Sequence, residues 1–503
     1  MTDEGGPALR VARGASYLWT QTIAKTLVQV VAFAFIARLI STTEMGLLAV
    51  LTLVVGLAQL IVALALPSAI VRFVSEELAS GRRLGAAAAL YQSLKISALL
   101  STLVSAGCFL SASYIAAALS TKPILFQLLA VDILLSAGLI QVIAAALVGA
   151  QRFREYSSVT VIHAIVRQAL ILGLLSVFRD FSWLVWAWVI SDVVYVLMIV
   201  SLAIRTLGPP TFGFSLGGLL KFSLPLMPGN SIAFTYAWYD RVLLIPYASI
   251  AALGIYNASL TAFNVLSSIP GGVATALYPV YAEIQSTRGR TGLEQAIRVA
   301  SRYVSFIAIP LALGLFATAK PALSLFVGEQ YEAGSTVLQI VTIFFALTAL
   351  GNAFGSTLLL LGRTMTVSTV TAVSVAASLV TALFLLPLLG ISGAAVSRGV
   401  GMAVGFFLTL ALTTRHIRLS FDHEAFWKSL VASLGMVIVV SLAQYAFYNR
   451  LLLPVYITLG ACTYVAGLRL LRAIDTADLE LANQFLGRRL QPIASLLRRI
   501  LIA

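Results

Sequence analysis

Charged residues are scarce in this sequence. Of its 503 residues, 33 are Lys or Arg and 19 are Asp or Glu, so 10% are charged, whereas a soluble chain has about one in four. Hydrophobic residues make up 60% of the chain. These proportions exclude a soluble globular fold and a disordered chain. They predict a protein that crosses a membrane many times.

Cysteine and histidine are rare as well, with two and three residues in the whole chain. Cys108 and Cys462 both lie in apolar runs, while His163, His416 and His423 are too far apart in sequence for a spaced zinc motif. We find no Walker loop and no Gly-rich phosphate loop after a strand. The sequence therefore predicts no disulfide framework, no metal and no cofactor.

Long apolar stretches fill most of the chain. A helix needs about 20 mostly apolar residues to cross the roughly 30 Å hydrocarbon core of a bilayer. Short charged or Gly/Pro breaks separate such stretches here, so we expect an all-α polytopic membrane protein with about 14 transmembrane helices. The predicted spans are 14–39, 46–70, 85–108, 123–149, 157–178, 183–204, 222–247, 254–281, 303–327, 335–361, 365–389, 393–412, 426–448 and 451–471.

The basic residues favour one side of the membrane. With the N-terminus inside, the outer loops contain only Lys122, Arg179 and Arg450, and most other Lys and Arg residues fall in inner segments. This bias predicts a multi-pass protein of the plasma (inner) membrane with both termini in the cytoplasm. The net charge of +14 then follows from topology and does not indicate nucleic acid.

A weak internal repeat indicates two lobes. The run 45–49 (MGLLA) follows the first span, and the run 253–257 (LGIYN) follows the seventh in an equivalent place. The alternative is a chance likeness between two apolar hairpins. We expect an N-terminal lobe over 1–210, a C-terminal lobe over 211–415, two appended spans over 416–472, and a basic amphipathic cytoplasmic tail over 473–503 that lies on anionic lipid.

Several short motifs carry a resemblance to a known family. They are 222–228 (FSLPLMP), the pair Asp240 and Arg241, 253–257 (LGIYN), 277–280 (LYPV), 328–331 (GEQY) and 390–395 (GISGAA). In this order the chain resembles the Wzx-type polysaccharide flippases of the MOP transporter superfamily, which includes the MATE transporters.

The resemblance implies a two-lobed fold that moves lipid-linked oligosaccharides from the cytoplasmic to the outer leaflet by alternating access. It implies a lipid-linked oligosaccharide and membrane lipids as partners, with glycan-assembly proteins as further candidates and no nucleic acid.

Five cations are predicted to lie inside spans, where each costs about 2.5 to 3.5 kcal/mol at a helix centre and so rarely faces lipid. A cavity with surplus positive charge suits an anionic headgroup, because Arg binds phosphate oxygens bidentately and Lys acts as a mobile point charge. The polyprenyl pyrophosphate of a lipid-linked sugar is such a group. The candidate substrate-binding residues are Lys25, Lys95, Arg167, Arg241 and Arg398.

Ion pairing is the alternative reading of these cations. Asp132, Asp192 and Asp240 could neutralise three of the five, which still leaves two over. Asp240 and Arg241 are not expected to pair simply, because adjacent residues on a helix point apart. Asp132 and Asp192 are also candidate sites for a coupling ion, H⁺ or Na⁺.

Two further functions compete with the flippase. A MATE-type multidrug antiporter coupled to H⁺ or Na⁺ would rest on carboxylates, whereas cations outnumber acids inside these spans. A membrane enzyme such as a glycosyltransferase would need a sizeable catalytic loop, and the predicted loops are short, so we expect no enzymatic activity.

Aromatic residues near the outer ends of spans six to eight indicate an interfacial belt or a sugar-stacking surface. They are Trp183, Trp186, Trp188, Tyr236, Trp238 and Tyr256.

Overall fold

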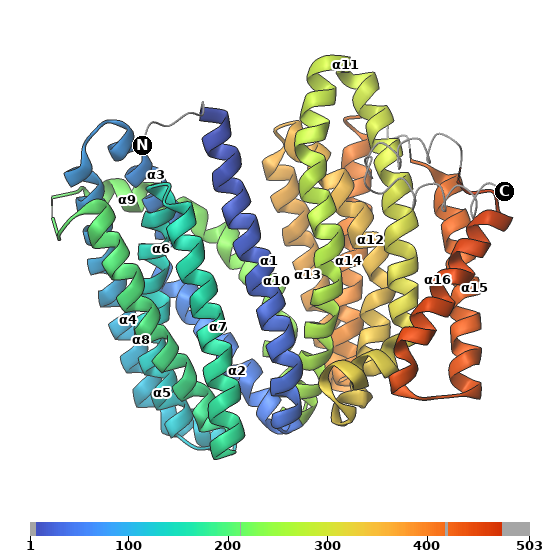
Figure 1. Ribbon diagram of the computed structural model, residues 1–503, viewed down its shortest axis with the longest axis horizontal. Coiled ribbons are helices and arrows are strands. Elements are labelled where there is room, and N and C mark those ends of the chain that lie inside the picture. The colour runs from blue at the N-terminus through green and yellow to red at the C-terminus, as the bar shows by residue number, and fades with distance from the viewer. Residues whose placement is uncertain (1–6, 212, 418–420, 475–503) are drawn as a thin grey trace. The chain divides into compact units, whose positions relative to one another are not determined.

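The computed structural model describes residues 7–211, 213–417 and 421–474, and within these ranges it contains helices and no strand (Figure 1). The predicted all-α membrane fold is confirmed. The chain divides into two compact units, Met1–Trp238 and Tyr239–Ala503. The predicted amphipathic tail lies outside the described residues, apart from its first two positions.

The first unit contains a bundle of long helices with two local irregularities. Ser41 begins the second helix with a capping box, in which its hydroxyl accepts from the Glu44 N–H and the Glu44 carboxylate accepts from the Ser41 N–H. The helices are α1 (Pro7–Leu39), α2 (Thr42–Ala63), α3 (Leu66–Ala79), α4 (Arg83–Ala118), α5 (Ile124–Ile133), the π-helix η1 (Leu134–Ile140), α6 (Gln141–Gly149), α7 (Phe153–Phe178), α8 (Ser182–Leu207), α9 (Leu216–Ser223), the 3₁₀ turn η2 (Leu224–Leu226) and α10 (Met227–Leu244).

The two irregularities divide predicted spans. Leu64 and Ala65 adopt positive φ values of 44° and 55°, so the predicted span 46–70 is two helices, α2 and α3, and Pro67 lies in the first turn of α3. The predicted span 123–149 continues from α5 to α6 through the π-helix η1. Single π-turns inside α-helices are frequent at functional sites.

The second unit contains the C-terminal end of α10, followed by the helical hairpin α11, which Figure 1 shows as two arms joined at a tip. Gly289 has φ 64° and ψ −157°, a combination open almost only to glycine, and it interrupts the helix there. The elements are α11 (Ile250–Val327), η3 (Glu329–Gly334), α12 (Ser335–Leu360), α13 (Thr364–Leu389), α14 (Ile391–Thr414), α15 (His423–Ala446), η4 (Arg450–Leu452) and α16 (Leu453–Leu470).

Twelve helices in the described ranges are long and apolar enough to cross a membrane, judged by length and composition. The other two of the fourteen predicted spans are the broken path α9–η2–α10 and the first arm of α11, where Ile250–Val265 forms a shorter apolar helix. Large apolar side chains such as Leu197, Phe384 and Tyr445 are exposed on the outer faces, as expected for surfaces that contact lipid.

The unit boundary lies inside α10, whereas the sequence repeat separates the lobes near residue 210. Packing accounts for the difference. Leu219 on α9 is fully buried in the core of the first unit, and the Phe73 ring on α3 lies 5.4 Å from that of Phe214 and 6.1 Å from that of Phe222. The segment after residue 210 therefore packs on the first unit, although the repeat assigns it to the second lobe.

Candidate functional site

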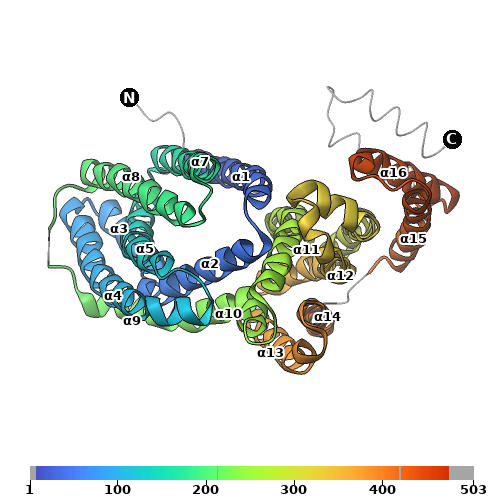
Figure 2. The same cartoon turned by 90° about the horizontal axis from the view of Figure 1, so that it is seen from below.

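A polar cavity of about 520 Å³ lies within the first unit. Side chains from α1, α2, η1, α6, α7 and α8 line it, and Figure 2 shows α1, α2, α7 and α8 around one interior when the molecule is viewed from below. Its volume falls in the range of about 300 to 1,000 Å³ that is usual for small-molecule sites. The cavity is the candidate site because it places ionisable groups inside membrane-spanning helices.

Arg167 and His163 share one carboxylate in this cavity. Nη1 of Arg167 donates to Oδ1 of Asp192 at 2.9 Å, and Nε2 of His163 lies 2.9 Å from the same oxygen. His163 and Arg167 are four residues apart on α7, so they lie on one helix face, and Asp192 on the facing α8 is almost completely buried. Asp192 thus balances the charge of Arg167.

Aromatic rings hold this ion pair in position. The Arg167 guanidinium lies 4.8 Å from the centre of the Trp188 ring, an arrangement that favours a cation–π interaction. His163 stacks on Tyr195 with 4.2 Å between ring centres, and the Tyr195 hydroxyl is 2.9 Å from Oγ1 of Thr160. One face of Trp188 and one of Tyr195 are therefore already occupied by side chains of the protein.

Lys25 on α1 also lines the cavity, and its side chain is exposed to it. Within the described part of the chain it has neither a hydrogen bond nor an ion pair. Its ammonium group experiences the positive field of Arg167. Lys25 is therefore a cation whose charge the surrounding side chains leave unbalanced.

Asp132 is not part of the cavity lining and lies at the end of α5, just before the π-helix η1. It is completely buried, and Oγ of Ser136 donates to its Oδ2 at 3.4 Å, while Oδ1 has no hydrogen-bond partner among the described residues. Its carboxyl group interacts with the carboxyl group of Asp192 and with the guanidinium group of Arg167. The two acidic side chains predicted as coupling sites are therefore brought together.

Arg241 and Arg398 belong to the second unit, where they form a buried cluster with Asp240. Oδ2 of Asp240 accepts from Nε of Arg398 at 2.8 Å and from the Tyr256 hydroxyl at 2.6 Å. Nε of Arg241 donates to Oδ1 of Asn257 at 3.0 Å. These bonds join α10, the first arm of α11 and α14.

The expectation that adjacent Asp240 and Arg241 would not pair is wrong. Nη1 of Arg241 lies 3.9 Å from Oδ1 of Asp240, and the backbone N–H of Arg241 donates to that same oxygen at 2.8 Å. The long arginine side chain still reaches the carboxylate, so the directions of the two Cα–Cβ bonds do not decide the contact.

Lys95 has a different environment from the other predicted cations. It is exposed on α4 and is absent from the lining of the cavity. The structure therefore brings Lys25 and Arg167 together in one cavity, places Arg241 and Arg398 in a second cluster, and leaves Lys95 outside both. Asp192 and Asp240 pair with the arginines, so two cations, Lys25 and Lys95, remain without an acidic partner among the described residues.

Glutamines are the functional candidates that sequence reasoning missed. Five glutamine side chains line the cavity, and on α1 two of them flank Lys25 at intervals of four residues, which a search for polar residues at helical spacing would have found. They are Gln21, Gln29, Gln59, Gln141 and Gln168. Among the described residues, no group of three His, Cys, Asp or Glu side chains is close enough to hold a metal ion.

The family follows from comparison with known sequences. Residues 35–336 match the family model described as "Polysaccharide biosynthesis protein". The chain belongs to this family. A relative with a curated description, the succinoglycan biosynthesis transport protein ExoT of Rhizobium meliloti (strain 1021), is 26% identical over 142 residues, and the match spans 28% of the length of that protein and 27% of this chain.

Solved structures show that this family member has a MOP-type fold. The lipid II flippase MurJ in an inward closed conformation matches with a TM-score of 0.72 and 14% identity, over 90% of this chain and 97% of MurJ. An inward-facing multidrug resistance MATE transporter of the MOP superfamily matches with a TM-score of 0.61 and 14% identity, over 78% and 94%. The predicted resemblance is confirmed: the chain belongs to the polysaccharide biosynthesis family, and its fold is similar to those of MurJ and of a MATE transporter of the MOP superfamily. Its apolar helices are those of a multi-pass membrane protein.

Proposed function

We propose that this transporter is a flippase that moves a polyprenyl-(pyro)phosphate-linked oligosaccharide from the inner to the outer leaflet by alternating access, without enzymatic activity. The observation that carries the proposal is Lys25, a cation without an acidic partner among the described residues, in a polar cavity inside membrane-spanning helices. An ammonium group in such a place is costly unless an anion or water neutralises it. A phosphate-bearing headgroup supplies the missing negative charge.

Lys25 and Arg167 are the residues that we assign to the headgroup. Lys25 is the mobile point charge, and Arg167 presents guanidinium N–H groups beyond the one that bonds Asp192. Arg241 and Arg398 neutralise the carboxylate of Asp240 and so stabilise the second unit. For these two cations we therefore favour ion pairing over substrate binding. Lys95 is outside the cavity and is expected to be dispensable for binding.

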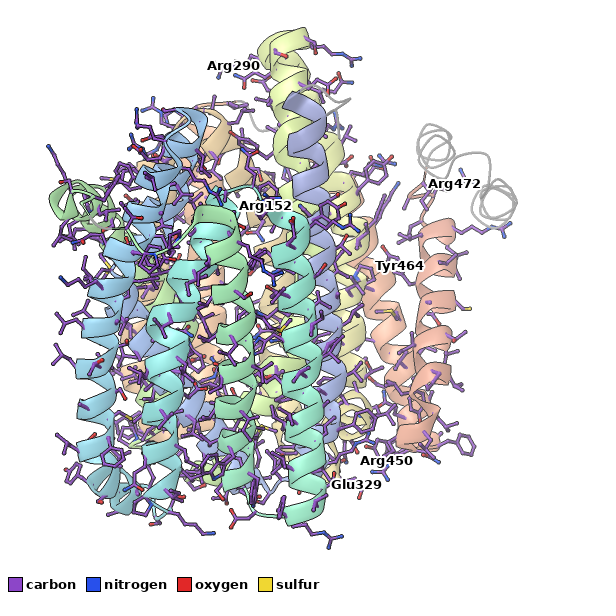
Figure 3. The ribbon with its side chains drawn as sticks, turned by 60° about the vertical axis from the view of Figure 1, so that its left-hand side comes forward. Arg152, Arg290, Glu329, Arg450, Tyr464 and Arg472 are labelled. Atoms are coloured by element: carbon purple, nitrogen blue, oxygen red, sulfur yellow. The ribbon has the colours of Figure 1, made fainter. Side chains whose placement is uncertain are left out.

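The orientation that we propose puts both termini in the cytoplasm of a plasma (inner) membrane. Within the second unit, Figure 3 shows Arg290 and Arg472 at one end and Arg450 beside Glu329 at the other, consistent with the predicted inner and outer positions of these arginines. A negative-inside potential then favours outward movement of an anion by about 2.3 kcal/mol per charge per 100 mV. Nucleotide hydrolysis is not required.

A MATE-type antiporter is the second candidate, and Asp132 is the observation in its favour. A buried carboxylate with one oxygen lacking a partner within the described chain suits H⁺ or Na⁺. In the flippase, the same group would couple transport to an ion gradient, so Asp132 and Asp192 remain our proposed coupling site.

The test is native mass spectrometry of the purified protein offered a polyprenyl-pyrophosphate oligosaccharide and a lipophilic cation together. We expect retention of the anionic lipid, weakened in Lys25→Gln and unchanged in Lys95→Gln, which removes an equal charge outside the cavity. Retention of the cation in preference to the lipid, undisturbed by Lys25→Gln, overturns the flippase in favour of the antiporter.

A further inference from the structure

The five cavity glutamines have unused hydrogen-bonding capacity. Gln21 and Gln29 come from α1, Gln59 from α2, Gln141 from α6 and Gln168 from α7, so the amides approach the cavity from several directions. None of these side chains makes a hydrogen bond within the described part of the chain, and Oε1 of Gln21 is fully buried without a partner. Gln29 is exposed and the other four are half-buried, so their N–H donors and carbonyl acceptors are available to a polar occupant of the cavity.

Charge in the cavity is nearly balanced. The fixed cations of its lining are Lys25 and Arg167, and Asp192 neutralises the arginine, which leaves one unbalanced positive charge. A pyrophosphate carries more than one negative charge and accepts hydrogen bonds without donating them when ionised. The lining therefore offers it Lys25, the remaining guanidinium N–H groups of Arg167 and the amide N–H groups, together with amide oxygens that it cannot use.

A sugar matches this lining better than a phosphate does. Each hydroxyl group both donates and accepts, as each glutamine amide does, so one sugar ring can satisfy several amides at once. Stacking contributes less, because Arg167 covers one face of Trp188 and His163 covers one face of Tyr195. Hydrogen bonds with the glutamine amides are therefore the main interaction that this lining offers a sugar.

We infer that the cavity of the first unit is a glycan subsite, in which the glutamine amides bind a neutral hexose of the lipid-linked saccharide while Lys25 supplies a single charge toward the linked phosphate. This inference rests on the proposed flippase and deepens it. It assigns the specificity of the site to uncharged side chains.

The experiment compares two probes by native mass spectrometry. One is a polyprenyl pyrophosphate that carries one neutral hexose, and the other is the same polyprenyl pyrophosphate without sugar. We expect wild-type protein to bind the hexose-bearing probe at least about tenfold more tightly, since a few additional hydrogen bonds amount to that factor. Gln21→Met/Gln29→Met keeps side-chain length, removes two amides and should abolish most of this preference.

Three further variants make the outcome decisive. Gln168→Met removes an amide from a different helix and should lower the preference even if the α1 double variant folds poorly. Gln127→Met changes a half-buried glutamine of α5 outside the cavity lining and should leave the preference unchanged. Lys25→Gln should weaken both probes equally, because both carry the pyrophosphate.

The remaining outcomes overturn either the glycan subsite alone or the flippase together with it. Equal binding of the two probes by wild-type protein, or a preference that survives both the α1 double variant and Gln168→Met, overturns the glycan subsite and leaves the flippase intact. Equal loss of both probes in the glutamine variants also overturns it, because the amides would then bind the pyrophosphate. Retention of a lipophilic cation with neither lipid bound overturns the proposed function and this inference together.

Discussion

Nε and Nη2 of Arg398 on α14 both lie 2.8 Å from Oδ2 of Asp240 on α10, and both residues are buried. Removing one partner of a buried ion pair leaves an uncompensated charge and typically costs about 3 to 5 kcal/mol. We therefore expect Asp240→Asn to lower the apparent Tm of the detergent-solubilised protein strongly. Asp240→Asn/Arg398→Gln should recover part of the loss.

The matched control for this pair is Glu424→Gln. Glu424 pairs with Lys428 on the surface of α15 with 75% of its side chain exposed, and surface pairs of this kind add little to stability. Its Tm should stay close to that of the wild type. A Tm unaffected by Asp240→Asn would show that the cluster does not stabilise the second unit.

Lys25 is expected to be necessary for transport as a charge. Lys25→Gln should reduce flipping of a fluorescent polyprenyl-pyrophosphate oligosaccharide in proteoliposomes by roughly 10- to 100-fold, because a hydrogen bond to a charged group contributes about 1.5 to 3 kcal/mol. Lys25→Arg should retain much of the activity. Normal flipping by Lys25→Gln, or an equal loss in Lys95→Gln, would contradict the assignment.

Asp132 is expected to act in ion coupling. Asp132→Asn keeps the size of the side chain and removes the charge that interacts with Asp192 and Arg167. Transport by this variant should no longer respond to an imposed proton or sodium gradient, while binding of the lipid persists. An unchanged gradient dependence would remove Asp132 from the coupling mechanism, and Asp192→Asn would then test the other carboxylate, which also faces His163 and Arg167.

Gly289 is predicted to be intolerant of a side chain. At φ 64° and ψ −157° an alanine is strained by about 1 to 3 kcal/mol, although no atom lies within 4 Å of its would-be Cβ. Gly289→Ala should lower the Tm and expose the tip of α11 to limited proteolysis. Gly173→Ala is the control, because Gly173 is helical, has equal open space and should be neutral or stabilising.

Asp180, in the turn between α7 and α8, predicts a pH effect. Its carboxylate accepts hydrogen bonds from Lys122 and from the hydroxyl and N–H groups of Ser182, and these bonds lower its pKa to about 2. The pKa of Asp in an unfolded chain is about 3.9. The ionised carboxylate of Asp180 therefore stabilises the folded protein fully above that pH, and this stabilisation is lost as the pH falls toward 2.

The corresponding measurement is the Tm of Asp180→Asn against that of wild type. The variant should be less stable at pH 7 by at most about 1 kcal/mol, since the Lys122 pair is exposed. The gap should narrow between pH 4 and pH 2. A gap that is constant over this window would mean that the carboxylate charge is not what stabilises the turn.

Much of the architecture follows from local sequence properties. Apolar length and the scarcity of charge predict the membrane helices, because a buried backbone in lipid must form helices or a closed barrel. The order of the motifs also indicated the family that residues 35–336 match. The division of span 46–70 at Leu64 and Ala65 was not predictable in this way, because neither residue type favours positive φ and only the surrounding packing imposes it.

The candidate site shows where sequence reasoning ends. The sequence by itself determined that five cations and three acids lie within spans, and helical spacing alone places His163 and Arg167 on one face. Only the tertiary structure decided that Arg167 joins Lys25 in a glutamine-lined cavity, whereas Arg398 pairs with Asp240. The physical reason is helix rotation: a polar residue must avoid lipid, but its sequence does not say which neighbouring helix it faces.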